Sequence, residues 1–414
     1  MTKAHLHSAH RISGTVLLAV SVLLLIVALK CQPALAQQSD EAAGLVKKDG
    51  RMLGEDIAAR ITVKSANGEP LCPSFSFSQI PDLPNLFIGK LKGSTPKGVC
   101  AGNVTLALFK LDWSTGIMTF LHTVVQVPFT YRNATIIAAY DPFVLSYKGK
   151  SWVAFECVGL HLSGTSSCIA PLVDQGGRVD TNRMTVPVVG DEGGKATRLR
   201  YSASTPKLLE FKSRVYLYWS AIESEKDGDR RWLSVETRGA ELELGSDDQM
   251  WVKGHAGREI SAHAHDLEVP VMTPDSSDPL RNMSVDTEGL FTADNRIIAL
   301  NSVGGAGEKG DSPCTKPIDD SPGCYRLEIT RTDEPLEKDS FKKEVMISPE
   351  VPVNPVEYPR LVTAPDKRTY LMINVHGLRS KAASDAGKVI EPGLFLVPFS
   401  ISSAKFQTTE RHPQ

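Results

Sequence analysis

Several features that mark common protein classes are missing from this sequence. Helical periodicity is scarce, which argues against a helical fold, and no low-complexity linker divides the chain into separate domains. A Gly-x-Ser-x-Gly elbow is absent, and the glycine run at 304–307 lacks the Lys-Ser/Thr and the helix of a phosphate-binding loop. The sequence therefore gives no sign of an α/β-hydrolase or a P-loop protein.

An excess of basic residues is also missing. The chain of 414 residues has 46 basic and 48 acidic residues, and without the first 36 residues it has 43 and 48, a net charge of −5. Proteins that bind nucleic acid concentrate positive charge, so this balance argues against a nucleic-acid partner. A neutral ligand or another protein is the expected partner.

The first 36 residues have the pattern of a signal peptide. Lys3 and Arg11 precede an apolar run at 16–29, and small residues at 34–36 then supply a cleavage site. The run is shorter than the roughly 20 residues of a membrane-spanning helix, and no second candidate span follows. We therefore predict an exported protein, secreted or periplasmic, with no membrane span after cleavage.

Cysteine is sparse, and one of the seven cysteines, Cys31, lies in the predicted signal peptide. In an exported chain the remaining six are expected to form disulfides, and neighbours in sequence are the natural pairs. The predicted pairs are Cys72 with Cys100, Cys157 with Cys168, and Cys314 with Cys324. This pairing leaves no cysteine for a thiol nucleophile or a zinc cluster.

One phrase returns four times along the chain, and each copy reads as a strand, a tight turn and a second strand. The clearest copy spans 140–155, and the others span 204–219, 287–300 and 357–374. Short alternating runs of Val, Ile, Phe, Tyr and Thr, bounded by turn residues, are typical of β-hairpins. Repeated units of short strands favour a β-propeller, so the sequence predicts an all-β chain.

A fifth unit is expected before the first copy, over 70–133, where strand patterns again surround a turn. The prediction is therefore a single-domain, five-bladed β-propeller over 70–405, with a C-terminal tail at 406–414. A β-sandwich pair and a six-bladed ring are the alternative architectures.

The segment 37–69, between the signal peptide and the propeller, contains a possible ring-closing strand. The strand at 57–64 is expected to pair with the last blade near 394–401. Such pairing would remove exposed sheet edges, which invite aggregation.

The innermost strand of each propeller blade lines a central channel, so equivalent residues of different blades lie close together. Asp141, Thr205, Glu288 and Glu357 hold equivalent places in the four copies. Glycoside cleavage needs such carboxyl groups, because one protonates the leaving oxygen while another activates water or attacks carbon. Crowded like charges also raise at least one pKa, as a general acid requires. We predict Asp141, Glu288 and Glu357 as catalytic residues.

With these residues the chain resembles the five-bladed propeller glycoside hydrolases, the superfamily of families 43, 62, 32 and 68. The resemblance rests on Asp141-Pro142, on Glu357-Tyr358-Pro359 and on the repeated phrase, and it covers most of the chain. It implies a glycosidase that acts on an oligosaccharide or polysaccharide. In arabinan-active members the successive blades supply a base, an orienting Asp and an acidic Glu. By that order Asp141 looks like the base or nucleophile, and Glu288 looks like the acid.

The chain departs from that pattern at its middle carboxylate, because residue 205 is a threonine. In one interpretation Glu357 replaces it; in the other, the protein is a non-catalytic propeller that binds a glycan or a protein. Asp141 also falls in the second predicted blade, so the family order is shifted. Glu156 follows Phe155 in a motif that resembles the acid of fructan-active members, but it ends a second strand and is set aside.

Other side chains are predicted to bind substrate. Arg200, Arg360 and His376 are candidate donors to sugar hydroxyls, with structural ion pairs as the alternative, and Thr205 lies among the predicted channel residues. Trp219 is a candidate platform for a sugar ring, with a place in the blade core as the alternative.

No metal site and no cofactor are predicted, although a structural calcium ion in the channel is left open. His263 and His265 share one face of a strand, but no third ligand follows at recognisable spacing.

Overall fold

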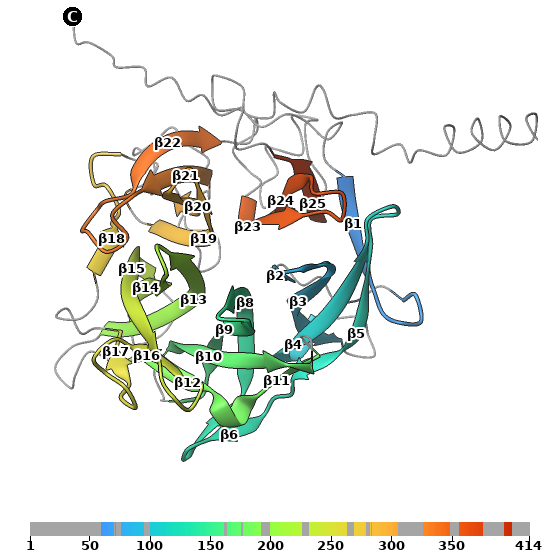
Figure 1. Ribbon diagram of the computed structural model, residues 1–414, viewed down its shortest axis with the longest axis horizontal. Helices are drawn as coiled ribbons and strands as arrows, with labels where there is room; N and C mark the ends of the chain where they lie inside the picture. The colour runs from blue at the N-terminus through green and yellow to red at the C-terminus, as the bar shows by residue number, and fades with distance from the viewer. Residues whose placement is uncertain are drawn as a thin grey trace, which may run out of the picture. The chain divides into compact units, whose positions relative to one another are not determined.

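The described part of the chain is built almost entirely of β-strands (Figure 1). The computed structural model describes residues 59–69, 71, 76–94, 100–160, 164–174, 177–191, 199–225, 232–262, 269–278, 282, 284–304, 326–347, 356–375 and 393–399, all within the unit Ala43–Gln414. These residues include one short 3-10 helix, η5 (Thr181–Arg183), and no helix suited in length and hydropathy to crossing a membrane. The all-β prediction is confirmed, whereas the predicted signal peptide lies outside the described residues.

The strands follow one another in antiparallel runs. The first run is β2 (Phe77–Ile80), β3 (Leu83–Ser94), β4 (Cys100–Asp112) and β5 (Ile117–Val125). The second is β8 (Ala138–Tyr147), β9 (Lys150–Val158), β10 (Thr165–Val173) and β12 (Thr185–Val189). The next is β13 (Leu199–Phe211), β14 (Arg214–Glu225) and β15 (Trp232–Leu244), with β16 (Met250–Val252) and β18 (Val269–Met272) both paired to β15.

The later strands continue this pattern. They are β19 (Ser284–Ala293), β20 (Arg296–Gly304), β21 (Arg326–Thr332) and β22 (Lys342–Ile347), followed by β23 (Val356–Thr363), β24 (Thr369–Val375) and β25 (Gly393–Pro398). Short elements attach to these runs, namely the hairpin of β6 (Phe129–Tyr131) and β7 (Ala134–Ile136), β11 (Arg178–Val179) beside β10, and β17 (Ile260–Ser261) beside β12. Each of the four repeated phrases forms the first hairpin of its run, as predicted.

The first strands of the runs contact one another in a closed cycle. β2 contacts β8, β8 contacts β13, β13 contacts β19, β19 contacts β23, and β23 contacts β2. Figure 1 shows these strands near the middle, with the later strands of each run farther out. Residues at the same point of each first strand are thereby brought together from distant parts of the sequence.

The strand β1 (Ala59–Lys64) joins the last run to the first. It pairs antiparallel with β25, with Ala59 opposite Leu396 and Ile61 opposite Leu394, and it lies parallel to β5. The pairing predicted between 57–64 and 394–401 is therefore confirmed. Its effect is to cover the free edge of β25, which would otherwise expose unpaired backbone groups.

A continuous hydrophobic core holds the central strands of neighbouring runs together. Trp152 on β9 and Trp219 on β14 are 0% and 1% exposed, and both belong to one cluster that also contains Val285 of β19 and Ile297 of β20. Each buried aromatic ring removes roughly 150–250 Å² from water. The apolar positions of the repeated phrase thus fix the first strands in place around their common centre.

One of the three predicted disulfides is present in the described residues. Cys157 on β9 and Cys168 on β10 are bonded, with their Cα atoms 6.0 Å apart. The bond links two neighbouring strands diagonally, because Cys157 lies opposite Ser166 and Cys168 lies opposite Phe155. The predicted pairs of Cys72 with Cys100 and Cys314 with Cys324 involve side chains outside the described residues.

Candidate active site

A backbone irregularity recurs in the first strand of four runs and re-aims one side chain in each. The register with the second strand shifts there, as expected for β-bulges, which are common next to active sites. The shifts lie between Tyr140 and Phe143, Ser204 and Lys207, Thr287 and Gly289, and Glu357 and Arg360. Three bulged residues have positive φ, namely Asp141 at 45°, Thr205 at 43° and Tyr358 at 53°. Non-glycine residues seldom adopt this conformation, and where they do so within a strand rather than in a turn the strain is a sign of a functional site.

This register corrects one predicted equivalence. Asp141, Thr205 and Glu288 occupy the same place in their runs, but the matching residue of the last run is Tyr358 rather than Glu357. Glu357 is one position earlier, where its backbone pairs opposite Asn374. The sequence alignment missed this offset because a bulge adds a residue without changing the hydrophobic pattern around it. The Glu357 side chain lies outside the described part of the structure.

Charged side chains gather where these first strands meet, and we name this group the inner cluster. Its members are Lys90, Asp141, Glu156, Lys207, Asp286, Glu288 and Arg360. Charged residues are seldom buried unless they are paired or serve a function. The members of the inner cluster come from six strands, β3, β8, β9, β13, β19 and β23.

Asp141 is held in its ionised form by a lysine. Lys90 Nζ lies 2.8 Å from Asp141 Oδ1 and 4.6 Å from the centre of the Tyr358 ring. Burial acts to raise the pKa of Asp141, but the positive charges of Lys90, Lys207 and Arg360 outweigh it and lower that pKa. Asp141 is therefore a buried carboxylate that carries its charge at neutral pH.

Glu156 is a second carboxyl group of the cluster, and its environment has the opposite effect. It lies on β9 opposite Tyr140 and accepts hydrogen bonds from the Ser204 hydroxyl and, at 3.2 Å, from the Thr205 N–H. Burial and the nearby charge of Asp141 raise the pKa of Glu156 to about 7. Glu156 was not predicted as a site residue because it lies near the end of a second strand. Since β9 runs antiparallel to β8, that end of β9 lies beside the bulge of β8.

Thr205 stands where the family pattern has a carboxylate, and it connects to one from the next run. Its hydroxyl oxygen lies 3.0 Å from Asp286 Oδ1 and 2.7 Å from Ser220 Oγ, and Ser220 also donates to Asp286. Burial raises the pKa of Asp286. Asp286 and Glu288 are two residues apart on β19 and both enter the inner cluster, so they are not a solvated surface pair.

A fully buried lysine lies among these carboxyl groups. Lys207 is 0% exposed and donates to the backbone oxygen of Thr205. Burial and the charge of Arg360 lower the pKa of Lys207 to about 8, although Glu288, Asp286 and Asp141 oppose this shift. The signal in the sequence was a lysine directly before the apolar pair Leu208 and Leu209, two residues after Thr205.

Glu288 and Arg360 complete the inner cluster. Arg360 Nη1 lies 3.7 Å from Glu288 Oε2, and this oxygen accepts no hydrogen bond. Burial, reinforced by the charge of Asp286, raises the pKa of Glu288 well above its usual value. Burial therefore disfavours the ionised form of Glu288, whereas the cations around Asp141 lower its pKa and favour its ionised form.

The other predicted ligand-binding residues lie elsewhere. Arg200, at the start of β13, is partly exposed, and within the described residues no hydrogen bond or ion pair joins it to the cluster. Trp219 is buried in the hydrophobic core, as in the alternative interpretation, and presents no open ring face. His376, like His263 and His265, lies outside the described residues.

In the part of the chain that the structure describes, no three His, Cys, Asp or Glu side chains are grouped to hold a metal ion. The expectation that the protein needs no cofactor, and the alternative of a calcium ion in the channel, both remain predictions.

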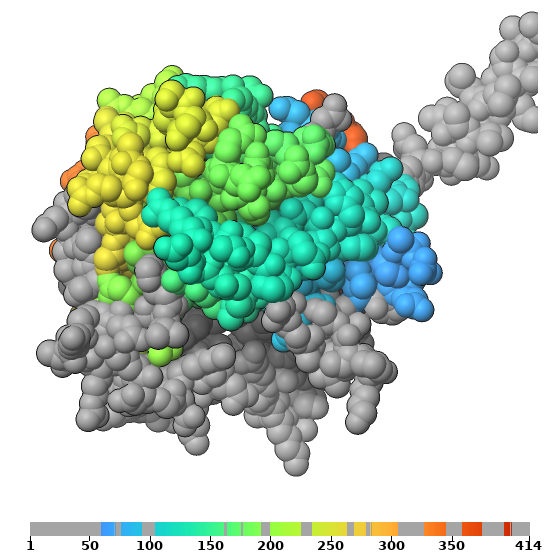
Figure 2. All heavy atoms as spheres, turned by 90° about the horizontal axis from the view of Figure 1, so that it is seen from below, coloured from blue at the N-terminus to red at the C-terminus, as the bar shows by residue number. Residues whose placement is uncertain are grey.

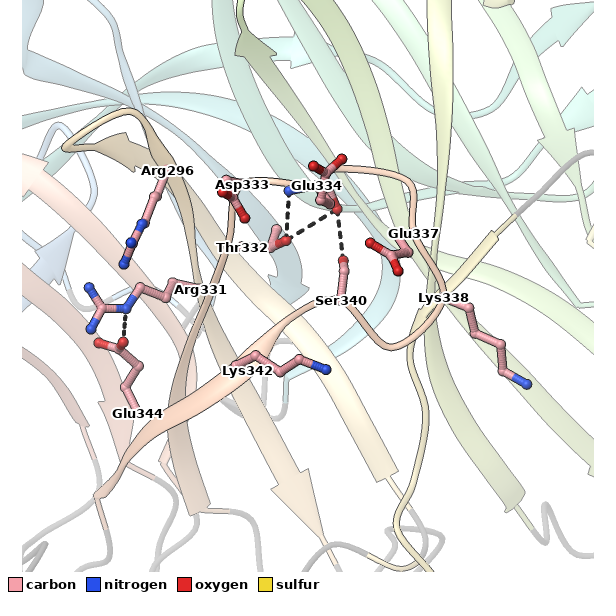
Figure 3. Close-up of a pocket in the computed structure, with 10 residues that line it drawn as sticks. All are labelled: Arg296, Arg331, Thr332, Asp333, Glu334, Glu337, Lys338, Ser340, Lys342 and Glu344. Carbon is pink, nitrogen blue, oxygen red and sulfur yellow. Dashed lines mark hydrogen bonds and ion pairs between the residues drawn. The ribbon is translucent and has the colours of Figure 1, made fainter. Parts of the chain in front are cut away.

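A separate hollow with charged walls lies between β20, β21 and β22, and we name it the outer groove (Figure 3). Its volume is about 340 Å³. It is lined by Arg296, Arg331, Thr332, Asp333, Glu334, Glu337, Lys338, Ser340, Lys342 and Glu344. None of these residues belongs to the inner cluster, and Figure 3 shows long charged side chains along the rim, with Arg331 paired to Glu344.

Comparisons with known proteins give likenesses among solved structures alone. No family model matches the chain, and no curated protein does. An α-L-arabinofuranosidase from Lactobacillus brevis is 10% identical, with 79% of this chain and 90% of that chain covered and a TM-score of 0.48. An endo-arabinase from Bacteroides thetaiotaomicron is 10% identical, with 83% and 95% covered and a TM-score of 0.49.

An arabinanase from Bacillus subtilis is 10% identical, with 80% of this chain and 96% of that chain covered and a TM-score of 0.44. The similar structures also include a family-43 glycoside hydrolase, a member of the superfamily that the sequence resembles. Identities and TM-scores this low do not assign an activity, which has to be inferred from the inner cluster.

Proposed function

We propose that the chain is an exported glycoside hydrolase or transglycosidase built on a five-bladed β-propeller. The antiparallel runs correspond to the blades, and β1 completes the last blade beside β25. The closed cycle of contacts among β2, β8, β13, β19 and β23 supports this arrangement, in which the bulged residues face the centre. The partner is an oligosaccharide or polysaccharide, with no nucleic acid involved and no cofactor required.

The observation that carries the proposal is that the pKa values of two carboxyl groups in one buried cluster are shifted in opposite directions. Asp141 has a lowered pKa beside Lys90, and Glu288 has a strongly raised pKa in its buried place. Environments that push the pKa values of two carboxyl groups apart separate a base from an acid. Glycoside hydrolysis needs this combination.

In the proposed mechanism Glu288 donates its proton to the oxygen of the leaving group. Its Oε2 atom is buried and accepts no hydrogen bond from the protein, so its hydrogen-bonding capacity is unused and would serve a substrate oxygen. Asp141 takes a proton from water that attacks the anomeric carbon, or attacks that carbon itself. Glu156, Asp286 and Glu357 are then residues that tune or orient these two.

A second candidate function is a propeller that binds a glycan or a protein without cleaving it. Asp141 is already paired with Lys90 at 2.8 Å, and a threonine occupies the place of the middle carboxylate. Both features are expected in a protein whose charged residues bind a ligand or stabilise the fold and take no part in cleavage. This candidate predicts binding with no product.

The test is product release by residues 37–414, without the predicted signal peptide, from arabinan, xylan, glucuronoxylan, fructan, sucrose and aryl glycosides. Replacing a general acid or base typically costs roughly 10²–10⁴-fold in rate, so Glu288→Gln and Asp141→Asn should each lose turnover by that factor. Glu344→Gln, in the outer groove, is the matched control and should keep the wild-type rate. Circular dichroism would verify that each variant is folded.

If the folded wild-type protein releases no product from any of these substrates, the hydrolase proposal fails and the binding propeller takes its place. Equal rates in the wild-type protein and both variants would show that the activity belongs to other residues.

A further inference from the structure

One edge of the Arg360 guanidinium has no partner in the described protein. Arg360 is 3% exposed, and its Nη1 atom donates to the Pro359 oxygen at 3.1 Å and faces Glu288. Its Nε and Nη2 atoms are buried and make no hydrogen bond. Buried donors in folded proteins nearly always have an acceptor, so two unsatisfied donors on one side chain require an explanation.

A second buried polar side chain of the same hairpin is also unsatisfied. Asn374, on β24 opposite Glu357, is 1% exposed, and neither its amide nitrogen nor its amide oxygen makes a hydrogen bond. Asn374 and Arg360 lie on paired strands at the bulge that contributes Tyr358 to the centre. Arg360 and Asn374 therefore place four unsatisfied polar atoms on one hairpin beside the inner cluster.

The charges of the cluster are also unbalanced at this point. Lys207 and Arg360 lie close enough for the charge of Arg360 to lower the pKa of Lys207. With Lys90, the cluster holds three cationic side chains and four carboxyl groups, and the pKa values of three of these, Glu156, Asp286 and Glu288, are raised. Among these four carboxyl groups Asp141 alone has a lowered pKa, and it is paired with Lys90, so an ionised group of a ligand would supply a charge partner for the unsatisfied edge of Arg360.

We propose that the Nε and Nη2 edge of Arg360 binds the carboxylate of an acidic sugar, so the substrate is a glycan that contains a uronic acid. This inference rests on the proposed function for the statement that the bound glycan is cleaved. The two parallel N–H groups of a guanidinium edge match the two oxygens of a carboxylate, and a neutral hydroxyl satisfies only one of them at a time. Because Glu288 faces the Nη1 side of the same guanidinium, the acidic sugar lies next to the proposed acid.

The test compares the binding of matched acidic and neutral sugars by calorimetry. Methyl glucuronide is measured against methyl glucoside, and methyl galacturonide against methyl galactoside, with glucose 6-sulfate as the sulfate probe. A charged hydrogen-bonded pair contributes enough for at least about tenfold tighter binding of one uronide than of its neutral match. Equal affinities within both pairs would overturn the inference, and a preference for the sulfate over both uronides would overturn the carboxylate assignment.

The variant Arg360→Lys keeps the positive charge and removes the guanidinium edge. It should reduce the preference for the uronide to less than about threefold, because a lysine cannot reproduce the two parallel bonds. The control is Arg368→Lys, an exposed arginine that pairs with Asp366 in the turn before β24, and it should keep the preference. An unchanged preference in a folded Arg360→Lys variant would overturn the inference.

A measurement on the wild-type protein alone covers the case in which Arg360→Lys does not fold. Acetate carries the same carboxylate, so it should weaken uronide binding and leave binding of the neutral sugar unchanged. Acetate without effect on the uronide would overturn the inference.

Turnover measured in parallel separates this inference from the proposed function. Uronide binding that depends on Arg360 but leads to no cleavage supports the carboxylate site and removes the hydrolase. Cleavage of neutral glycans with no preference for uronides supports the hydrolase and removes the carboxylate site.

Discussion

Two regions of the molecule contain the same kinds of charged side chain and differ in their access to water. In the inner cluster Arg360 and Glu288 are each 4% exposed as side chains, whereas in the outer groove Arg331 and Glu344 are 34% and 12% exposed. In the space-filling view of Figure 2 the side chains of successive parts of the chain, coloured from cyan to yellow, lie against one another across one face of the molecule. Charge interactions strengthen as water is removed, which is why the pKa values of carboxyl groups in the inner cluster are shifted in opposite directions.

An open hollow lined with charged side chains is thus a weaker indication of an active site than a buried charged cluster. The outer groove is a well-defined hollow of about 340 Å³, but its lining consists of surface side chains of both signs. Surface ion pairs contribute little because water competes for each partner. The inner cluster instead combines bulged backbone, buried charges and unsatisfied donors, and these are the features that a functional site requires.

The largest expected effect tests whether the inner cluster is truly withdrawn from water. Lys90→Met would leave Asp141 buried without its ion-pair partner, which typically costs about 3–5 kcal/mol. The free energy of unfolding, measured by urea titration, should fall by that amount. A loss below about 1 kcal/mol would mean that Asp141 is as well solvated as a surface carboxylate, and the comparison would fail.

A smaller effect should appear in the pH dependence of stability through Glu156. The pKa of Glu156 rises from 4.5 to about 7 on folding, so between these values the folded protein holds a proton that the unfolded chain has lost. The free energy of unfolding should therefore fall as pH rises from 4.5 to 7, with a contribution of up to about 3 kcal/mol. Glu156→Gln removes this contribution and should flatten the profile.

The measurement is urea unfolding at several pH values across that window, with Glu344→Gln as the matched control from the outer groove. The control should follow the wild-type slope. Identical slopes for the wild-type protein and Glu156→Gln would show that Glu156 has the same pKa in both states.

The smallest effect is expected in the outer groove. Arg331→Met removes the ion pair with Glu344, and exposed pairs contribute about 0–1 kcal/mol. The free energy of unfolding should therefore change by no more than about 1 kcal/mol in the same urea titration. A loss as large as that of Lys90→Met would mean that the ion pair of the outer groove is as well shielded from water as that of the inner cluster.

Much of the fold could be predicted because its signals are local. Each repeated phrase contains its own strand, turn and strand, so the hairpins of β8 with β9 and β13 with β14 follow from alternation and turn residues. The pair of Cys157 and Cys168 is also local, since only 11 residues separate them. The pairing of β1 with β25 was predicted from the need to cover a sheet edge rather than from a sequence signal.

The sequence pointed only to those members of the inner cluster that occupy a recurring position in the first strand of a run. Asp141 and Glu288 were predicted to lie together because they stand at the same point of the phrase, and their catalytic roles remain predictions. Glu357 was aligned one residue too early because the bulge is invisible in the hydrophobic pattern. Lys90 and Glu156 lie on other strands and reach the centre through pairing across the sheet. Their roles could not be read from spacing along the chain.

The strands, the turns and the buried aromatic positions follow from the sequence alone, because these depend on side-chain alternation and on neighbours within one hairpin. Which charged side chains are buried together and which stay exposed to solvent depends on the tertiary structure. A pKa depends on the solvent and charges within a few ångströms, and those neighbours come from strands more than a hundred residues apart in the sequence, as with Lys90 and Lys207. An arginine and a glutamate form a surface ion pair in the outer groove, as Arg331 and Glu344, and belong to a candidate active site in the inner cluster, as Arg360 and Glu288.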